Sequence, residues 1–340
     1  MQLALTPDER AVQDVFVAFF TNESPPEIVR AAEPLGFDAE LWAKLAATGA
    51  PSMALPESVG GGGADLAALA VVVEEAGRTL APVPLIEHAI ALRLAHAADL
   101  DATTLAAIAS SNRIAAIALR PAVGGTAGLV PAGAVADVIL VLDGTDLVLA
   151  EVPAPAHAPA NTAAAPLADR PLGGAKVLAT GAKAARLIAR ARAEWFALTA
   201  TEAAAMGRQV LQLGVDYVME RTQFGVPVGS FQAVQHGLAD ASVRIEGATL
   251  LAQRAVWALD ADRPEANELA AMAHLFCCDA AQQAAAASMQ FHGGYGYAEE
   301  YDVQLYYRRV KGRMLLPGSP GSQYQALADD LLGPVSGGAS

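Results

Sequence analysis

The chain is poor in positive charge, in cysteine and in long apolar runs, and each shortage argues against a class of function. Its 340 residues include only 22 Lys or Arg against 36 Asp or Glu, so the formal net charge is −14. Proteins that bind nucleic acid contact its phosphates with clustered Lys and Arg side chains. The excess of acidic residues therefore argues against a nucleic-acid partner. No stretch of about 18 apolar residues is free of charge, and we therefore expect no membrane span.

The two cysteines, Cys277 and Cys278, are adjacent in the sequence. Neighbouring cysteines rarely bond to each other, because a disulfide requires a particular separation of its Cα atoms. We expect both to be reduced core residues of a cytoplasmic protein. The first residues lack the basic and apolar regions of a signal peptide, so none is expected, and no metal site is predicted.

Hydrophobic residues, many of them alanine, make up 54% of the chain. Residues 1–105 read as helical, and Thr6-Pro7-Asp8-Glu9 has the composition of a capped helix start. The glycine run Gly60 to Gly63 precedes Asp65, a residue suited to cap the next helix. No Lys-Ser/Thr pair follows these glycines, so they do not form a phosphate loop of the P-loop type.

The pattern changes twice along the rest of the chain. Residues 106–182 contain short β-like runs, IAAIAL, DVILVL and DLVLAEV, bounded by Gly, Pro and Asp. Residues 183–333 return to apolar positions three and four apart, which predicts a helical bundle. The expected helices are 183–221, 231–260, 264–291, about 301–314 and about 321–332. Residues 334–340 are expected to form a disordered tail. The predicted fold class is mainly α with a central β domain.

Two glycine-containing stretches interrupt the helical patterns. The first, Arg221 to Gln235, breaks at a Gly/Pro turn and restarts a helix near Phe231. A restarting helix offers unpaired N–H groups and a positive dipole end, so such a junction can hold an anionic ligand. The second, Gln290 to Tyr297, turns on Gly293 and Gly294, which allow positive φ and close approach of a ligand. Taken singly, each stretch is more simply read as a solvated surface arginine or a helix C-cap.

Together and in this order, the two stretches resemble the carboxyl-terminal domain of the acyl-CoA dehydrogenase family. Three segments of the first half, Trp42 to Gly49, Pro56 to Gly63 and Glu74 to Arg78, resemble its amino-terminal domain. The resemblance implies three domains: an N-terminal helical domain (1–105), a reduced β-barrel (106–182) and a C-terminal four-helix bundle (183–333). It also implies FAD as cofactor and an acyl-CoA substrate. The cofactor contacts that it implies are Arg221, Gln223, Phe224, Phe231, Gln232, Gln290, Gly293 and Gly294.

The chain departs from the family pattern at the catalytic base. In the family a Glu usually takes the α-proton of the thioester, and here Pro317 stands at that place. Some members carry the base on an earlier helix, where this chain has Trp195 with Glu194 beside it. One residue turns a side chain by about 100° around a helix, so Glu194 is the base only if the alignment slips. Glu202 and Glu246 are further acids, and we expect them at a surface or an interface.

The β domain departs from the family as well. The family's substrate and flavin loop is replaced by Leu119 to Gly125, and the region holds no Trp to flank a flavin ring. The Ala/Pro-rich segment 152–166 reads as an irregular loop. On a later helix, Arg308 and Arg309 are expected to pair with acids rather than to bind a partner.

A chain that keeps the cofactor motifs but lacks the base resembles the non-catalytic subunits of heteromeric α2β2 bacterial acyl-CoA dehydrogenases. These enzymes act in steroid degradation. The resemblance implies that the chain completes the flavin site of a homologous catalytic subunit, which supplies the base. An electron-transfer flavoprotein is a further candidate partner. Two alternatives stay open: a homomeric dehydrogenase with Glu194 as its base, and a flavin-free scaffold or regulatory protein. Flavin in the lone chain, only in a pair, or in neither would separate the three hypotheses.

Overall fold

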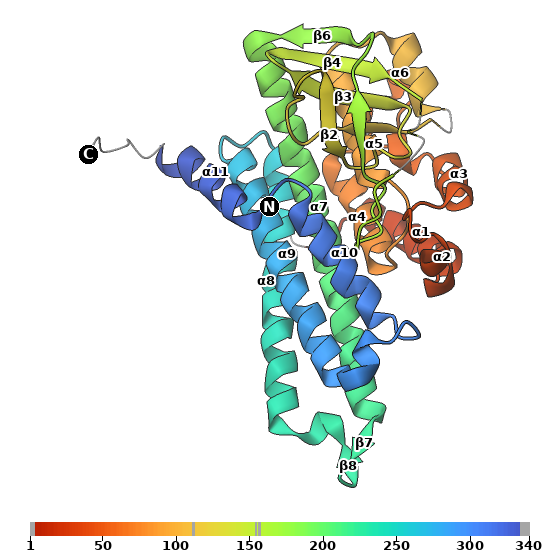
Figure 1. The fold of residues 1–340 in the computed structure, drawn as a ribbon, viewed down its shortest axis with the longest axis vertical. Helices are drawn as coiled ribbons and strands as arrows, with labels where there is room; N and C mark the ends of the chain where they lie inside the picture. The colour runs from red at the N-terminus through yellow and green to blue at the C-terminus, as the bar shows by residue number, and fades with distance from the viewer. Residues whose placement is uncertain (1–3, 111–112, 154, 156–157, 334–340) are drawn as a thin grey trace.

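The fold combines a bundle of long helices with a group of short strands at one end (Figure 1). This computed structural model describes residues 4–110, 113–153, 155 and 158–333. The N-terminal helices lie beside the strands and the adjoining part of the bundle. The predicted fold class, mainly α with a central β domain, is confirmed. The predicted tail, 334–340, lies outside the described residues.

The N-terminal third consists of short helices, several of which begin at a side-chain cap. Thr6 opens the first with a capping box: its hydroxyl accepts from the Glu9 N–H at 3.2 Å, and the Glu9 carboxylate accepts from the Thr6 N–H at 2.6 Å. Asp65, after the glycine run, accepts from the Ala68 N–H. Both caps were predicted from the sequence. The elements are α1 (Pro7–Glu23), α2 (Pro26–Ala31), α3 (Ala39–Ala47), η1 (Ala50–Ser52), η2 (Glu57–Val59), α4 (Leu66–Arg78), α5 (Leu85–Ala97) and α6 (Ala102–Ala109).

Helix α5 connects the N-terminal helices to the strands, and most of its residues are buried between them. It packs against α7 and against the first strand, β1 (Ala115–Ile117). The Nδ1 atom of His88 accepts a hydrogen bond from the Ala115 N–H at 3.1 Å. Burial lowers the pKa of His88 to about 3. The ring therefore stays neutral near pH 7 and ties α5 to the sheet as a hydrogen-bond acceptor.

The β domain consists of two small sheets. The larger has the strand order β1–β3–β4–β6, with β1 parallel to β3 and the other pairs antiparallel, and the smaller pairs β2 with β5. The three runs predicted from the sequence are β1, β3 and β4. Strands β2, β5 and β6 were not predicted; Gly128 and the left-handed Leu129 interrupt the pattern of β2. The remaining bounds are β2 (Thr126–Val130), β3 (Val138–Asp143), β4 (Asp146–Glu151), β5 (Ala168–Pro171) and β6 (Lys176–Thr180).

The C-terminal half is the helical bundle, and its helices agree with the predicted ranges to within a few residues. They are α7 (Gly181–Glu220), α8 (Gln232–Asp260), α9 (Ala266–His292), α10 (Val303–Leu315) and α11 (Pro320–Leu332). Helix α7, with 40 residues, runs from the strands to the far end of the bundle (Figure 1). It approaches α9 closely at Gly207 and Gly214, where a Cβ would crowd Ala281 and Ser288.

Two further expectations concern membrane-spanning helices and the two cysteines. None of the helices in the described part of the chain is long and apolar enough to span a bilayer. Cys277 and Cys278 are free thiols buried within α9, as predicted. Burial raises the pKa of the Cys277 thiol to about 12, so this sulfur is not a thiolate near neutral pH.

Candidate functional site

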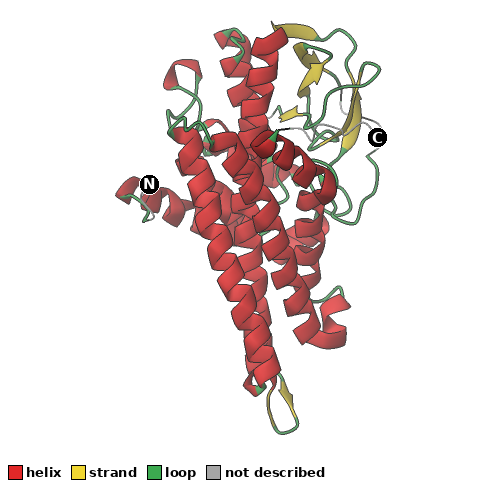
Figure 2. Ribbon diagram, turned by 90° about the vertical axis from the view of Figure 1, so that its left-hand side faces the viewer, coloured by secondary structure: helices red, strands yellow, loops and turns green. Residues whose placement is uncertain are grey.

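The first predicted motif forms a β-hairpin at the end of the bundle that lies farthest from the sheets (Figure 2). Its elements are β7 (Thr222–Gln223), β8 (Val226–Pro227) and η3 (Val228–Ser230). The turn uses two residues of positive φ, Phe224 at 55° and Gly225 at 83°. A bulky residue rarely adopts this conformation. Here it leaves the Phe224 ring 93% exposed.

The second motif meets the first across the helix ends. Helix α9 ends at His292, Gly293 takes a φ of 62°, and the short 3-10 helix η4 (Gly293–Tyr297) follows. The guanidinium of Arg221 lies 5.7 Å from the centre of the Tyr295 ring, which is a cation–π distance. The two motifs therefore share one surface, residues 219–232 and 290–297, which we call the bundle tip.

The bundle tip is exposed and rich in aromatic rings. All eight residues predicted to contact a cofactor are exposed. Tyr297 is 80% exposed and Met219 65%. A Cβ added at Gly293 or Gly294 would meet nothing within 4 Å, so the backbone there is open to an approaching group. An exposed apolar surface rimmed by polar groups is typical of a site that another molecule covers.

FAD carries a planar ring system and a diphosphate, and the bundle tip suits such a group. Arg221 offers a fork of N–H donors to an anion, the exposed rings offer stacking surfaces, and the open glycine backbone allows close approach. The chain's own β domain does not suit it. The loop Leu119 to Gly125 carries no acid, Ser or Thr, and segment 161–167 fills space between the β domain and α10.

Glu194, the candidate base, lies in the first half of α7, far from the bundle tip. It precedes Arg221 by 27 residues, which is about 40 Å along a helix. Its carboxylate accepts two hydrogen bonds from Arg93, both at 2.9 Å, and one from Arg190 at 3.0 Å. The residue is 4% exposed. The carboxylate is therefore held by donors on both oxygens.

These contacts set the proton affinity of Glu194. Burial alone would raise its pKa, but the hydrogen bonds and charges of Arg93 and Arg190 outweigh burial and lower it. A base that removes the α-proton of a thioester needs the opposite shift, toward neutral pH. The geometry therefore favours a structural ion pair, and the role of Glu194 as a base stays a prediction that these contacts do not support.

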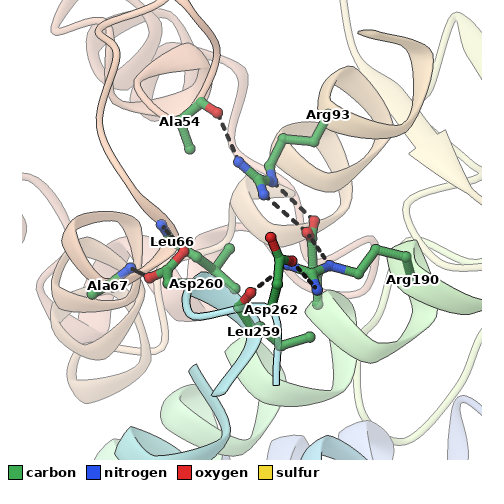
Figure 3. Close-up of polar contacts among 9 residues, drawn as sticks. Ala54, Leu66, Ala67, Arg93, Arg190, Leu259, Asp260 and Asp262 are labelled. Atoms are coloured by element: carbon green, nitrogen blue, oxygen red, sulfur yellow. Dashed lines mark hydrogen bonds and ion pairs between the residues drawn. The ribbon is translucent and has the colours of Figure 1, made fainter. Parts of the chain in front are cut away.

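The two arginines also bind backbone carbonyls from other elements. Arg93 donates to the Ala54 carbonyl at 2.9 Å, and Arg190 donates to the Leu259 carbonyl at 2.6 Å. Figure 3 shows the two guanidinium groups, from α5 and α7, pointing toward the carboxylate between them. The cluster around Glu194 thus joins the loop before the glycine run, α5, α7 and the end of α8.

Asp260, in the same region, holds the end of α8 to the start of α4 (Figure 3). Its carboxylate accepts from the N–H groups of Leu66 and Ala67 at 3.0 and 2.9 Å. Replacing Asp260 by Ala should lower the free energy of unfolding by about 1–2 kcal/mol, because two helix-terminal donors lose their acceptor. Asp262→Asn is the control: that side chain is 88% exposed and pairs with Arg190, and Asn tolerates the positive φ of 46° at this position, so we expect less than about 0.5 kcal/mol. Equal effects of the two substitutions in urea unfolding would contradict this assignment.

A second buried ion cluster was missed by the sequence analysis. Arg313 on α10 donates to Glu87 of α5 at 2.7 Å and pairs with both carboxylate oxygens of Glu202 on α7, at 2.7 and 2.9 Å. The expected surface or interface position of Glu202 is wrong, because it is only 7% exposed within the protein, whereas Glu246 is exposed. Spacing along one helix cannot reveal a partner on another helix, so the sequence carried no signal for this cluster.

The charges of this second cluster depend on one another. Burial is the main cause that raises the pKa of Glu202 above its ordinary value. Burial alone would lower the pKa of Arg313, but the attraction of Glu202 and Glu87 outweighs it and raises that pKa. Arg313 is therefore the fixed charge of the cluster, and the two carboxylates rely on it.

Comparison with known proteins gives matches over both halves of the chain. Residues 6–103 match the model of the acyl-CoA dehydrogenase N-terminal domain, and residues 196–332 match that of the acyl-CoA dehydrogenase C-terminal domain. The acyl-CoA dehydrogenase IpdE2 of Mycobacterium tuberculosis is 32% identical over 344 residues, which cover 96% of this chain and 98% of that protein. IpdE2 of Mycolicibacterium smegmatis is 29% identical over 326 residues, which cover 95% and 98%.

Two solved structures share the fold closely. The Tcur3481-Tcur3483 steroid acyl-CoA dehydrogenase matches with a TM-score of 0.86 and 26% identity, over 95% of this chain and 97% of that chain. The ChsE4-ChsE5 complex from Mycobacterium tuberculosis matches with the same TM-score and identity, over 97% and 99%.

Proposed function

Because this chain belongs to the acyl-CoA dehydrogenase family, we propose that it serves the FAD-dependent α,β-dehydrogenation of an acyl-CoA thioester. We propose further that it does so as the subunit that completes the flavin site of a homologous catalytic partner. The observation that carries the proposal is the division of its site. The predicted cofactor residues face outward at the bundle tip, whereas Pro317 stands where the family's base usually lies.

This reaction removes the α-proton of the thioester to a base and its β-hydrogen as hydride; FAD, when bound, would supply the hydride acceptor. The residues of this chain would bind and shield the cofactor and would leave the proton transfer to the partner. Arg221 would neutralise negative charge on the cofactor, and Gly293 and Gly294 would let its diphosphate approach the backbone. The exposed rings of Phe224 and Tyr297 would cover its apolar surface and exclude water.

Two matched structures support a heteromeric assembly, because their names describe pairs of chains, ChsE4-ChsE5 and Tcur3481-Tcur3483. The second is named as a steroid enzyme, which supports a steroid-derived acyl-CoA as the substrate class. The likeness of this chain to both extends over nearly its whole length.

The two alternatives receive less support from the geometry. A homomeric dehydrogenase needs a base in this chain, and the candidate Glu194 is held by Arg93 and Arg190 with a lowered pKa. A flavin-free scaffold gives no role to the exposed Arg221 or to the open glycine turn at the bundle tip.

The deciding measurement is a flavin absorbance spectrum, taken on the chain alone and on the chain co-purified with a homologous subunit encoded nearby. We expect a flavin band only in the pair, together with acyl-CoA-dependent bleaching of that band. A band in the lone chain would support the homomeric enzyme. The absence of flavin from both preparations would support the scaffold.

Within the pair, Arg221→Ala should weaken FAD binding by about 10- to 100-fold, because an exposed charge-assisted contact of about 1.5–3 kcal/mol is lost. The measurement is FAD affinity by fluorescence titration of the deflavinated complex. Arg186→Ala, an exposed arginine near the other end of α7, is the matched control and should leave affinity unchanged. Equal affinity in the Arg221 variant and the wild type would remove the bundle tip from the cofactor site.

A further inference from the structure

The segment from Asn161 to Leu167, which we call the strap, lies between the β domain and helix α10. It belongs to the connection between β4 and β5 and has no regular secondary structure of its own except a turn. Asn161 stiffens it: its side-chain oxygen accepts from the Ala165 N–H at 3.0 Å, and its amide donates to the Ala165 carbonyl at 2.8 Å. The strap therefore keeps a defined shape without being part of a sheet.

Two glycines from distant parts of the chain form a slot that receives the strap. A Cβ at Gly36, in the N-terminal domain, would overlap the Ala164 carbonyl. A Cβ at Gly312, on α10, would overlap the Ala163 Cβ. The Ala164 carbonyl thus packs directly on Gly36 and the Ala163 methyl group on Gly312, at positions where no larger residue fits.

Charged side chains hold the strap in this slot. Arg309 donates to the Ala164 carbonyl at 2.8 Å, and Arg308 donates to the Thr162 carbonyl at 2.9 Å. Glu33 binds both arginines, at 2.8 Å from Arg308 and 3.4 Å from Arg309. The sequence prediction that these arginines pair with an acid is confirmed, and the structure adds that they clamp the strap.

The strap separates two hollows of unequal size. The inner one, about 60 Å³, is lined by Glu87, Glu202 and Arg309 among others and has room for a few water molecules. The outer one, about 460 Å³, is large enough for part of a small ligand. Both are lined by the same shared residues, which are Ala163, Ala165, Leu167, Gly312 and Leu316.

The outer hollow has the lining expected for an amphipathic anion. Apolar walls come from Leu129, Leu315 and Leu316, and cations come from Arg308 and Lys311. We propose that the strap is an internal plug: seated in its glycine slot, it closes this chain's own cleft, and its release joins the two hollows into one site for a ligand with an apolar chain and an anionic head.

The plug rests on the proposed function in one respect. If the partner subunit holds the working site, a closed cleft in this chain explains why this chain does not carry out the reaction itself. The strap is well suited to release. Ala163, Ala164 and Ala165 bury little apolar surface, so the clamp and the slot supply most of what holds them. Release would also free the guanidinium groups of Arg308 and Arg309 to meet an anion.

Gly312→Ala tests the plug directly in the full-length chain. An Ala normally stabilises the middle of a helix relative to Gly, whereas here its Cβ would displace Ala163. Hydrogen exchange of the strap amides, those of Ala164, Ala165 and Leu167, should become at least about tenfold faster while the bundle amides stay unchanged. Octanoyl-CoA, measured by calorimetry, should bind the variant at least about tenfold more tightly than it binds the wild type.

Gly321→Ala is the matched control, because a Cβ there meets nothing within 4 Å, and it should change neither readout. Glu33→Gln is the second variant: it removes the acid that orients Arg308 and Arg309, so it loosens the clamp without adding a side chain to the slot or removing a cation, and it should give the same two changes. It decides the matter if Gly312→Ala does not fold.

Unchanged exchange of the strap amides overturns the proposal, as does octanoyl-CoA binding of equal strength in the wild type and both variants. Faster exchange without tighter binding of octanoyl-CoA overturns it too, because the strap then does not block a ligand site. The flavin spectrum of the two-subunit complex is read separately in each variant. The absence of a flavin band from the wild-type pair would count against the proposed function. Unchanged exchange of the strap amides in the variants would count only against the plug.

Discussion

Replacing Arg313 by Met is expected to lower the free energy of unfolding by about 3–5 kcal/mol, because it leaves two buried carboxylates without their cation. Glu87 and Glu202 are 2% and 7% exposed, and the few water molecules for which the adjoining hollow has room cannot replace the charge of the guanidinium. The measurement is urea unfolding at pH 7. Arg263→Met is the control: that residue pairs with Glu265 at the surface, and its loss should cost less than about 0.5 kcal/mol.

The same variant should become less stable as the pH rises. The pKa of Glu202 is already raised by burial in the native protein, and losing Arg313 raises it further. A folded-state pKa above the unfolded value gives a contribution that is present at low pH and fades as the pH rises through the folded-state pKa. Adding Glu202→Gln should therefore restore part of the lost stability at pH 8. A variant of Arg313 with equal stability at pH 5 and pH 8 would refute this account.

Glu194→Gln is expected to lower the free energy of unfolding by about 2–3 kcal/mol and to leave turnover of the two-subunit enzyme unchanged. The range is below that of a fully buried pair because Arg93 and Arg190 are 23% and 34% exposed. Its pH dependence is opposite to that of Glu202. The pKa of Glu194 is lowered, so its contribution is present above about pH 4.5 and is lost as the pH falls through the folded-state value.

Glu246→Gln, an exposed acid on α8, is the matched control and should change neither stability nor turnover. Thermal unfolding and steady-state turnover of the co-purified pair distinguish the two roles of Glu194. If Glu194→Gln abolished turnover while the melting temperature and bound flavin stayed at wild-type values, Glu194 would be the base, and the proposal that the partner supplies the base would be wrong.

The helices of this chain could be predicted from the sequence because their apolar periodicity, caps and glycine breaks are local signals. Thr6 and Asp65 cap the helices that the sequence assigned to them. Strand β5 could not be predicted in the same way: its four residues are Ala-Asp-Arg-Pro, and they form a strand because Arg170 is buried and donates to backbone carbonyls of neighbouring segments.

The candidate site was predictable only in part, for a related reason. The two motifs of the bundle tip carry their own sequence signature, which identifies their residues, whereas their contact through Arg221 and Tyr295 depends on the fold. Glu194 has one partner on its own helix, Arg190. Its other partner, Arg93, and the partners of Glu202 and Arg313 lie on other elements, up to 226 residues away in the sequence. Long-range charge pairs leave no local pattern, so only the structure reveals them.

Helix α7 also has a mechanical consequence. It is continuous from β6 to the hairpin, and its 40 residues amount to a rod of about 60 Å. Its two interior glycines do not act as joints, since Gly207 and Gly214 are seated against α9. A rod of that length turns a tilt of about 1° at the strands into a shift of about 1 Å at the hairpin. A subunit that binds the hairpin would therefore also fix the orientation of the sheets, at the opposite end of α7, relative to itself.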